Sequence, residues 1–198
     1  MSENIQKAAA SKLPDHARLV ERHISSEQVF DGVLLDVRRD VVTLPNSEAS
    51  KREWIKHPGA TAVLPVFENG DVMLLNQFRY PIGQIFLEVP AGKIDPGEDP
   101  ETTGLRELEE ETGLRCGDYA YLGHYYPGIG YSNEVLHFYI AWNLEQLEAH
   151  ADHDEFLELV RIPFTEAVER VYSGEISDGK TALCLLRGLE WWKKKGPS

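Results

Sequence analysis

The sequence predicts an α+β fold, in which short antiparallel strands make up most of the chain and only a few helices are interspersed. Strand-like segments follow one another closely, and helical segments occur in the middle and at the C-terminal end rather than after each strand. A doubly wound sheet requires regular β-α-β alternation, which this pattern lacks. The 198 residues, 42% of them hydrophobic, suit one sizeable core better than two.

The N-terminal part is expected to form a polar tail followed by an antiparallel β meander. Strand patterns predict segments at 18–24, 29–37 and 41–44, separated by SSEQ and RRD. We therefore divide the chain into residues 1–45, which hold the tail and the meander, and residues 46–198, which hold the main domain.

The main domain is expected to continue with strands and to end with two helices. Runs at 61–67 and 72–77 flank ENGD, which predicts a β-hairpin. Further strands are predicted at 85–89, 119–126, 134–142 and 156–162. The closing helices are predicted from near Thr165 to just before Gly174 and over about 179–195, with Asp178 as the N-cap of the second.

Charge and cysteine content argue against several classes of protein. The chain has 20 Lys and Arg against 33 Asp and Glu, a formal net charge of -13, so nucleic acid is not an expected partner. A substrate with two phosphates would need divalent cations to offset the same repulsion. Two cysteines are too few for a disulfide framework, and neither a signal-peptide pattern nor a membrane span is present. We expect a soluble, cytoplasmic protein.

The most informative segment is GKIDPGEDPETTGLRELEEETGL, residues 92–114. Asp99 can cap a helix whose first residue is Pro100, where the missing N–H costs nothing, and Gly113 supplies a left-handed stop. A helix over about 100–112 is therefore predicted.

Three carboxylates share one face of this helix. Glu107 and Glu111 are about 40° apart around the axis, and Glu110 is about 60° to the other side of Glu107. A Glu-rich face is often merely solvated. Like charges at this spacing nevertheless destabilise a helix, and Arg106 is the nearby opposite charge. A divalent cation that prefers oxygen ligands, Mg²⁺ or Mn²⁺, would relieve the repulsion.

The same segment resembles the Nudix box, G-x5-E-x7-R-E-U-x-E-E-x-G-U, where U is a bulky aliphatic residue. Its fixed positions are filled by Gly92, Glu98, Arg106, Glu107, Leu108, Glu110, Glu111, Gly113 and Leu114. The resemblance implies the Nudix fold, a mixed β-sheet sandwiched between helices. It also implies a metal-dependent enzyme that cleaves a nucleoside diphosphate linked to another moiety.

The resemblance also implies roles for the residues of the box. Glu107 and Glu111 would be metal ligands together with the backbone carbonyl of Ala91, and Glu98 and Glu110 would support them. Arg106 would orient the carboxylates. A plain helix salt bridge between Arg106 and Glu110 is the alternative and is compatible with that role.

The segments beside the box resemble the ADP-ribose and nucleoside-diphosphate-sugar branch of the family. They are EVPAGKIDPGE, QFRYP upstream and YYPGIGYSNE downstream, where Pro127 corresponds to the proline that follows the box in this branch. ADP-ribose is the expected substrate, with AMP and ribose 5-phosphate as products. The alternatives are hydrolysis of GDP-mannose or another nucleotide sugar and, in a different class, a non-catalytic Nudix domain that senses ADP-ribose.

Residues outside the box are candidates for binding and proton transfer. Arg79 is suited to bind the phosphates, with a surface ion pair as the alternative, and Trp54 could stack on the nucleobase or pack in the core. The family often takes its general base from a later loop, which favours Glu155 in ADHDEFLEL as base or further metal ligand. Glu134 is its competitor. Members of this branch commonly form homodimers through N-terminal strands, so the meander predicts a homodimer.

Overall fold

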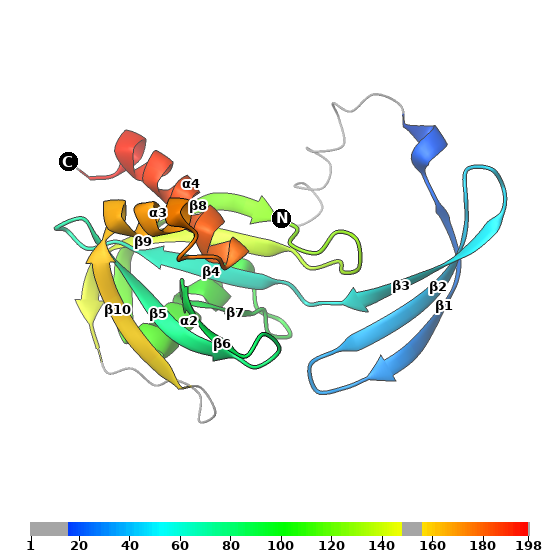
Figure 1. The fold of residues 1–198 in the computed structure, drawn as a ribbon, viewed down its shortest axis with the longest axis horizontal. Helices are drawn as coiled ribbons and strands as arrows, with labels where there is room; N and C mark the ends of the chain where they lie inside the picture. The colour runs from blue at the N-terminus through cyan, green and yellow to red at the C-terminus, as the bar shows by residue number, and fades with distance from the viewer. Residues whose placement is uncertain (1–15, 148–155, 198) are drawn as a thin grey trace. The chain divides into compact units, whose positions relative to one another are not determined.

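The computed structural model describes residues 16–147 and 156–197, and the chain divides into two units after Lys56. The N-terminal unit is an antiparallel sheet with the strand order β1-β2-β3 (Figure 1). Its elements are a short 3-10 turn, η1 (Ala17–Leu19), and the strands β1 (Arg22–Asp31), β2 (Asp36–Thr43) and β3 (Ala49–Lys56).

The predicted antiparallel meander is confirmed, but its strand bounds were wrong. SSEQ lies inside β1 and RRD inside β2, where each was expected to separate strands. Because every residue of β1 is exposed, this strand needs no hydrophobic alternation, and backbone pairing with β2 defines it instead. The third strand begins inside the expected loop, and the division after Lys56 lies beyond the boundary expected at residue 45.

The C-terminal unit contains two sheets. One has the strand order β7-β4-β9-β8, with β4 parallel to β9 and the other pairs antiparallel, and the second is antiparallel with the order β10-β5-β6. Its strands are β4 (Ala60–Pro65), β5 (Asp71–Arg79), β6 (Gln84–Glu88), β7 (Ala91–Lys93), β8 (Leu114–Tyr125), β9 (Leu136–Gln146) and β10 (Leu157–Pro163). Its helices are α2 (Pro100–Thr112), α3 (Phe164–Ser173) and α4 (Gly179–Lys195). The expected mixed sheet is therefore present.

The predicted hairpin around ENGD was wrong in its pairing. The turn itself forms, with the Gly70 N–H donating to the Phe67 carbonyl at 2.9 Å, but only the bridge between Val66 and Val72 joins the two runs. Beyond it, β4 and β5 belong to different sheets. Both edges of β4 are taken by β7 and β9, and both edges of β5 by β6 and β10, so neither strand has an edge left for the other.

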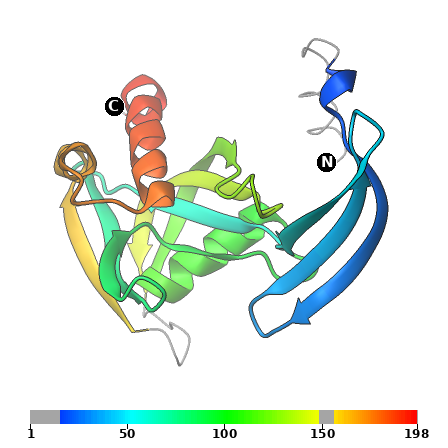
Figure 2. The same cartoon turned by 45° about the vertical axis from the view of Figure 1, so that its right-hand side comes forward.

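Helices lie on both faces of the four-stranded sheet (Figures 1 and 2). α2 contacts β4, β7 and β8, whereas α4 contacts β4, β8 and β9. Side chains alternate along β4, as expected for a strand buried on both faces. Ala62 and Leu64 pack in one cluster with Leu185 of α4, and Val63 packs in another with Leu108 of α2. A separate hydrophobic core therefore fills each face of the sheet.

The predicted helix ends are confirmed. The Asp99 side chain accepts the Thr102 N–H at 2.8 Å at the start of α2, and Gly113 ends this helix with a φ of 66°. At the start of α4 the Asp178 side chain accepts the Thr181 N–H at 3.0 Å. Local capping signals therefore fix the ends of the helices that border the site.

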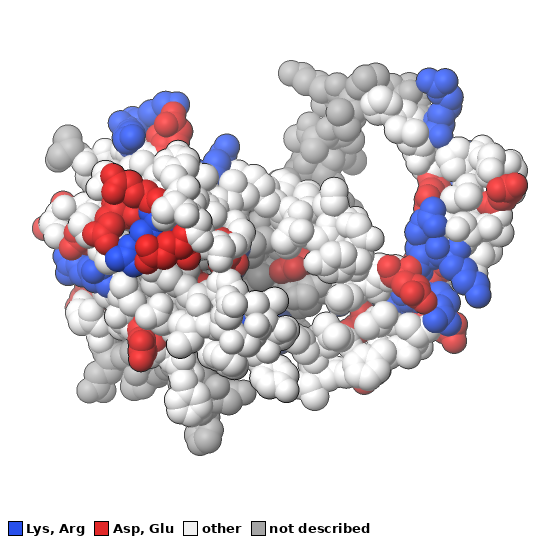
Figure 3. All heavy atoms as spheres, viewed as in Figure 1, with Lys and Arg blue, Asp and Glu red and all other residues white. Residues whose placement is uncertain are grey.

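α3 follows β10, packs beside α4 and carries paired charges on its outer surface. Arg170 binds Glu166 at 2.7 Å and Glu175 at 2.8 Å, and Figure 3 shows acidic and basic side chains next to one another over this helix. Within the described ranges, no helix combines the length and the apolar character that a membrane crossing requires.

Candidate functional site

The strand β7 and the helix α2 meet closely at two points. At Gly92, a Cβ atom would fall on the carboxylate of Glu107, so only glycine leaves room for that side chain. At the preceding residue, the Ala91 N–H donates to Oε2 of Glu111 at 2.9 Å. Glu111 is buried, and the Glu107 side chain is only 12% exposed. The two carboxylates are therefore held against the backbone of β7.

Arg106 joins the other carboxylates of the predicted motif. Its Nε and Nη2 donate to the two oxygens of Glu98 at 3.0 and 3.1 Å, and its Nη1 donates to Glu107 at 3.0 Å and to Glu110 at 2.7 Å. The hydrogen bonds from Arg106, with a further one from the Thr103 hydroxyl, lower the pKa of Glu98 to about 2. Arg106 thus contacts three carboxylates of the motif and also pairs with Asp95 at 3.8 Å. Its bond to Glu110 is the i,i+4 salt bridge expected as the alternative.

The carboxylates suit a divalent cation in chemistry, although they do not surround one position. In the part of the chain that the structure describes, no three His, Cys, Asp or Glu side chains are grouped closely enough to hold a metal ion. Glu107 and Glu110 face Arg106 in this arrangement. The space beside Gly92 holds one oxygen-donor carboxylate, and Glu111 lies next to Ala91. This donor set fits Mg²⁺ or Mn²⁺, both of which prefer oxygen ligands.

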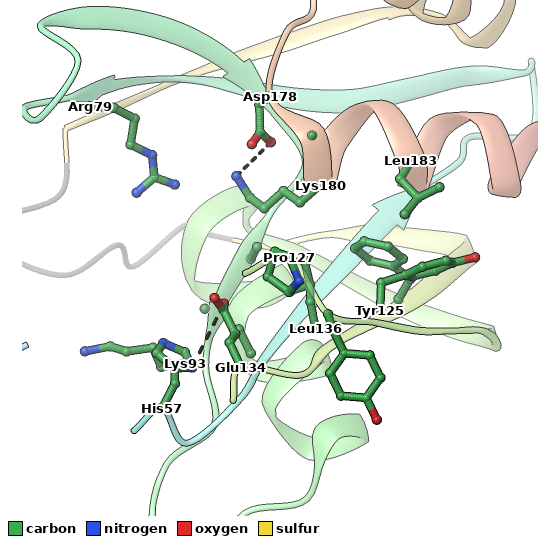
Figure 4. A pocket seen from close by; sticks show the side chains of 16 residues that line it. His57, Arg79, Lys93, Tyr125, Pro127, Glu134, Leu136, Asp178, Lys180 and Leu183 are labelled. Carbon is green, nitrogen blue, oxygen red and sulfur yellow. Dashed lines mark hydrogen bonds and ion pairs between the residues drawn. The ribbon is translucent and has the colours of Figure 1, made fainter. Parts of the chain in front are cut away.

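A pocket of about 610 Å³ is lined in part by residues of β7 and is large enough for a nucleotide-sized ligand (Figure 4). Its lining includes Ala91, Gly92 and Lys93 of β7, and the backbone of Ala91 and Gly92 lies against Glu111 and Glu107. Its polar lining consists of His57, Arg79, Lys93, Glu134, Asp178 and Lys180. Its apolar and aromatic lining includes Tyr125, Tyr126, Pro127, Leu136, Phe138 and Leu183. Charged groups and ring-stacking surfaces are therefore available in one cavity.

The structure brings several of the predicted binding residues to this pocket. Arg79, Pro127, Glu134 and Ala91 all line it. The Glu134 carboxylate lies 4.0 Å from Nδ1 of His57, and that nitrogen also accepts the N–H of Gly59 at 3.0 Å. Nδ1 of His57 therefore acts as an acceptor, which places the ring proton of the neutral imidazole on Nε2.

Among the predicted residues outside the box, Trp54 and Glu155 are not part of the described pocket lining. Trp54 lies on β3 in the N-terminal unit, where its indole N–H donates to Asp40 at 2.9 Å and the ring is partly buried. Glu155 lies outside the described residues. Stacking by Trp54 and base catalysis by Glu155 stay predictions.

Sequence reasoning missed a network of charges at one side of the pocket. Glu88, at the end of β6, is 2% exposed and accepts from Arg79 Nε at 2.8 Å, from Arg79 Nη2 at 2.6 Å and from the Lys180 ammonium. The contact with Glu88 raises the pKa of Arg79. Arg79 thus forms an ion pair, as the alternative reading expected, but its partner is buried. A glutamate inside the apolar run IFLEV was the signal that could have indicated this partner.

The chain is similar to known proteins over most of its length. Residues 56–181 match the family model described as NUDIX domain. The ADP-ribose pyrophosphatase of Bacillus subtilis is 42% identical over 169 residues, which are 84% of this chain and 91% of that protein. A methanol dehydrogenase activator of Bacillus methanolicus is 38% identical over 167 residues, 83% of this chain and 90% of that protein.

A solved structure described as an ADP compounds hydrolase has the same fold. It superimposes with a TM-score of 0.79 at 22% identity, over 90% of this chain and 97% of that chain. The family match covers more than half of the chain and contains β7, α2 and the residues that line the pocket up to Lys180. The complete box, the mixed sheet between helices and these similarities together establish that the chain belongs to the Nudix hydrolase family.

Proposed function

We propose that the protein hydrolyses the pyrophosphate bond of ADP-ribose to give AMP and ribose 5-phosphate. The observation that carries this proposal is the position of Ala91 and Gly92, which line the ligand-sized pocket and also lie against the carboxylates of Glu111 and Glu107 on α2. A diphosphate in the pocket would therefore lie beside the acidic helix. The similarity to an ADP-ribose pyrophosphatase at 42% identity supports the choice of substrate.

A divalent metal ion completes the proposed site, with Mg²⁺ preferred and Mn²⁺ as a substitute. Glu107 and Glu111 would hold it together with the carbonyl of Ala91, and Glu98 and Glu110 would support them. When bound, the ion supplies positive charge for the phosphates and lowers the pKa of a coordinated water. Arg106 would act as a positioning residue, because one guanidinium donates to Glu98, Glu107 and Glu110.

Residues of the pocket would bind the substrate. Arg79 uses Nε and Nη2 for Glu88, and its side chain lines the pocket and is 42% exposed, so its guanidinium can also donate to a phosphate oxygen. Tyr125 and Pro127 offer flat surfaces to the nucleoside or the sugar. Stacking of the base on Trp54 remains part of the proposal.

We propose that one of two carboxylates acts as the general base. Glu155 is the first candidate, as base or as a further metal ligand. Glu134 is the competitor, and its place in the pocket lining, with a side chain 28% exposed, supports it. Replacing each by glutamine separates them, because the loss of a general base lowers turnover by about 10²-fold to 10⁴-fold. Equal, small effects of both replacements would refute both assignments.

We further propose that the enzyme is a cytoplasmic homodimer to which the N-terminal strands contribute. The antiparallel unit β1-β2-β3 has an exposed outer strand, which is available for contacts with a second copy. Cys116 and Cys184 are free thiols, which suits a reducing compartment. Multi-angle light scattering of the full chain measures the assembly, and a monomer mass at micromolar concentration would refute the dimer.

The test of the proposed reaction is direct. Purified protein is incubated with ADP-ribose and Mg²⁺, with and without a chelator, and the products are identified by mass. Chelator-sensitive release of AMP and ribose 5-phosphate is the expected result. GDP-mannose is assayed in parallel, and a higher kcat/KM for it would replace ADP-ribose as substrate. Binding of ADP-ribose without cleavage under any metal would favour the sensor function instead.

A further inference from the structure

We propose that His124, His137 and Tyr121 form a separate metal site, which binds a transition-metal dication of the zinc type on the outside of the four-stranded sheet. None of the three residues lines the substrate pocket or belongs to the box. They lie on the paired strands β8 and β9 (Figure 1). The inference is therefore independent of the proposed reaction.

The three side chains converge on one atom. His124 and His137 are directly opposite each other in the register of β8 and β9, and their ring centroids are 6.0 Å apart. The Tyr121 hydroxyl lies 3.2 Å from Nδ1 of His124 and 3.1 Å from Nδ1 of His137. Both imidazoles thus direct the same ring nitrogen at one phenol oxygen.

The spacing of these donors is close to the spacing around a tetrahedral zinc ion. Zinc binds nitrogen and oxygen ligands at about 2.0–2.1 Å, so two ligand atoms of a tetrahedron are about 3.3 Å apart. The two N···O separations of 3.1 and 3.2 Å nearly match this value. Rotation of the imidazole rings would then bring both nitrogens to one ion. Three protein donors leave the fourth position to a water molecule.

Neighbouring aromatic rings hold two of these donors in place. The ring of Tyr126 packs edge-on against His124 at 5.7 Å, and the ring of Tyr139 lies 5.1 Å from that of Tyr121. Because the side chains are already ordered, a metal ion would lose less free energy in fixing them.

The protons of the cluster can be accounted for. A phenol has one proton, so Tyr121 donates to one Nδ1 and accepts from the other. On metal binding, the donating imidazole would move its proton to Nε2, and the phenol proton would pass to water. Burial raises the pKa of Tyr121, so this proton leaves when the ion takes its place. Burial and the nearby His124 lower the pKa of His137, which favours the neutral ring that binds metals.

The donor types distinguish this site from the carboxylates of α2. Imidazole nitrogen favours Zn²⁺, Ni²⁺ and Cu²⁺, whereas carboxylate oxygen suits Mg²⁺ and Mn²⁺. No three His, Cys, Asp or Glu side chains meet within residues 16–147 and 156–197, and Tyr121 supplies the third donor here. Tyr121 is 44% exposed, so an ion can reach it from solvent, and the formal net charge of -13 attracts cations.

Isothermal titration calorimetry of the full-length protein with Zn²⁺ tests the site, with an excess of Mg²⁺ present to occupy the carboxylates. H124Q and H137Q are compared with the wild type and with H23Q. His23 is the matched control, because it is an exposed histidine of β1 that contacts only the Ser26 hydroxyl, at 2.8 Å, among the hydrogen bonds of the described residues. H124Q and H137Q should each bind Zn²⁺ at this site at least about tenfold more weakly, and H23Q should bind as the wild type does.

Tyr121→Phe tests the third donor, because it removes the oxygen and keeps both imidazoles. It should weaken Zn²⁺ binding by about tenfold. Wild-type affinity in H124Q or H137Q would overturn the inference, and so would an equal loss in H23Q. Wild-type affinity in Tyr121→Phe would overturn the role of the phenol.

Diffraction from wild-type crystals soaked in Zn²⁺ provides a second test that does not depend on the folding of any variant. Data collected at the zinc absorption edge should show an anomalous peak between the two Nδ1 atoms and the Tyr121 oxygen. Anomalous peaks only at other places would overturn the inference. Because both tests measure metal binding and not hydrolysis, their failure would leave the proposed reaction untouched.

Discussion

Replacement of Gly92 by alanine tests whether the close contact between β7 and α2 matters for catalysis. The added Cβ would fall on the Glu107 carboxylate, whereas non-bonded carbon atoms need a separation of about 3.5 Å. The side chain of Glu107 or the strand must therefore shift by on the order of 1 Å. Overpacking of this kind costs about 1–3 kcal/mol of stability, and because the end of a glutamate side chain can move, we expect a value near the lower limit.

The effect on turnover should be much larger than the effect on stability. A displacement of about 1 Å in a catalytic group can lower the rate by roughly 100-fold. The initial rate of ADP-ribose hydrolysis with saturating Mg²⁺ measures this, and thermal unfolding measures stability in parallel. Gly130→Ala is the control, because a Cβ at Gly130 meets open space. A Gly92→Ala enzyme with kcat within twofold of the wild type would refute the role given to this contact.

Three further variants test other parts of the site and the core. Glu111→Gln keeps an acceptor for the Ala91 N–H but removes the negative charge of a proposed metal ligand. Turnover should therefore fall by about 100-fold, with little change in the unfolding midpoint. An unchanged kcat would contradict the assignment of Glu111 as a ligand. Leu108→Ala empties a fully buried position and should cost about 2–5 kcal/mol in urea unfolding, and a cost below 1 kcal/mol would be too small for a core residue. The pKa of Glu98 lies at about 2, below its usual 4.5, so its stabilising effect is complete above pH 4.5 and is lost as the pH falls through 2. Arg106→Gln should therefore reduce the acid dependence of stability between pH 4.5 and 2, and identical pH profiles of the two proteins would exclude this coupling.

The chemistry of α2 was predictable because its signals are local. Asp99, Pro100 and Gly113 determine where the helix begins and ends, and the spacing of the glutamates determines which face they share. The same is true of Asp178 at the start of α4. Such signals act within a few residues, so they can be identified from the sequence alone. The box could be recognised for the same reason.

Strand pairing was less predictable, because it depends on partners that are distant in the chain. ENGD forms its turn, but β4 pairs in parallel with β9 and β5 pairs with β10, so the expected hairpin ends after one bridge. Exposed polar strands such as β1 also lack the hydrophobic alternation from which strand bounds are inferred. Which strands pair with one another therefore depends on all the strands of a sheet and not on the turn between two of them.

The sequence by itself determined the family motif, the ends of the helices and the carboxylates of the site. Only the tertiary structure brought Glu88 and Lys180, 92 residues apart, to the same side of the pocket and placed Arg79 between its buried partner and the ligand space. The physical reason is that a helix cap or an i,i+4 face is fixed by neighbours along the chain, whereas a buried ion pair depends on which surfaces pack together when the sheets close.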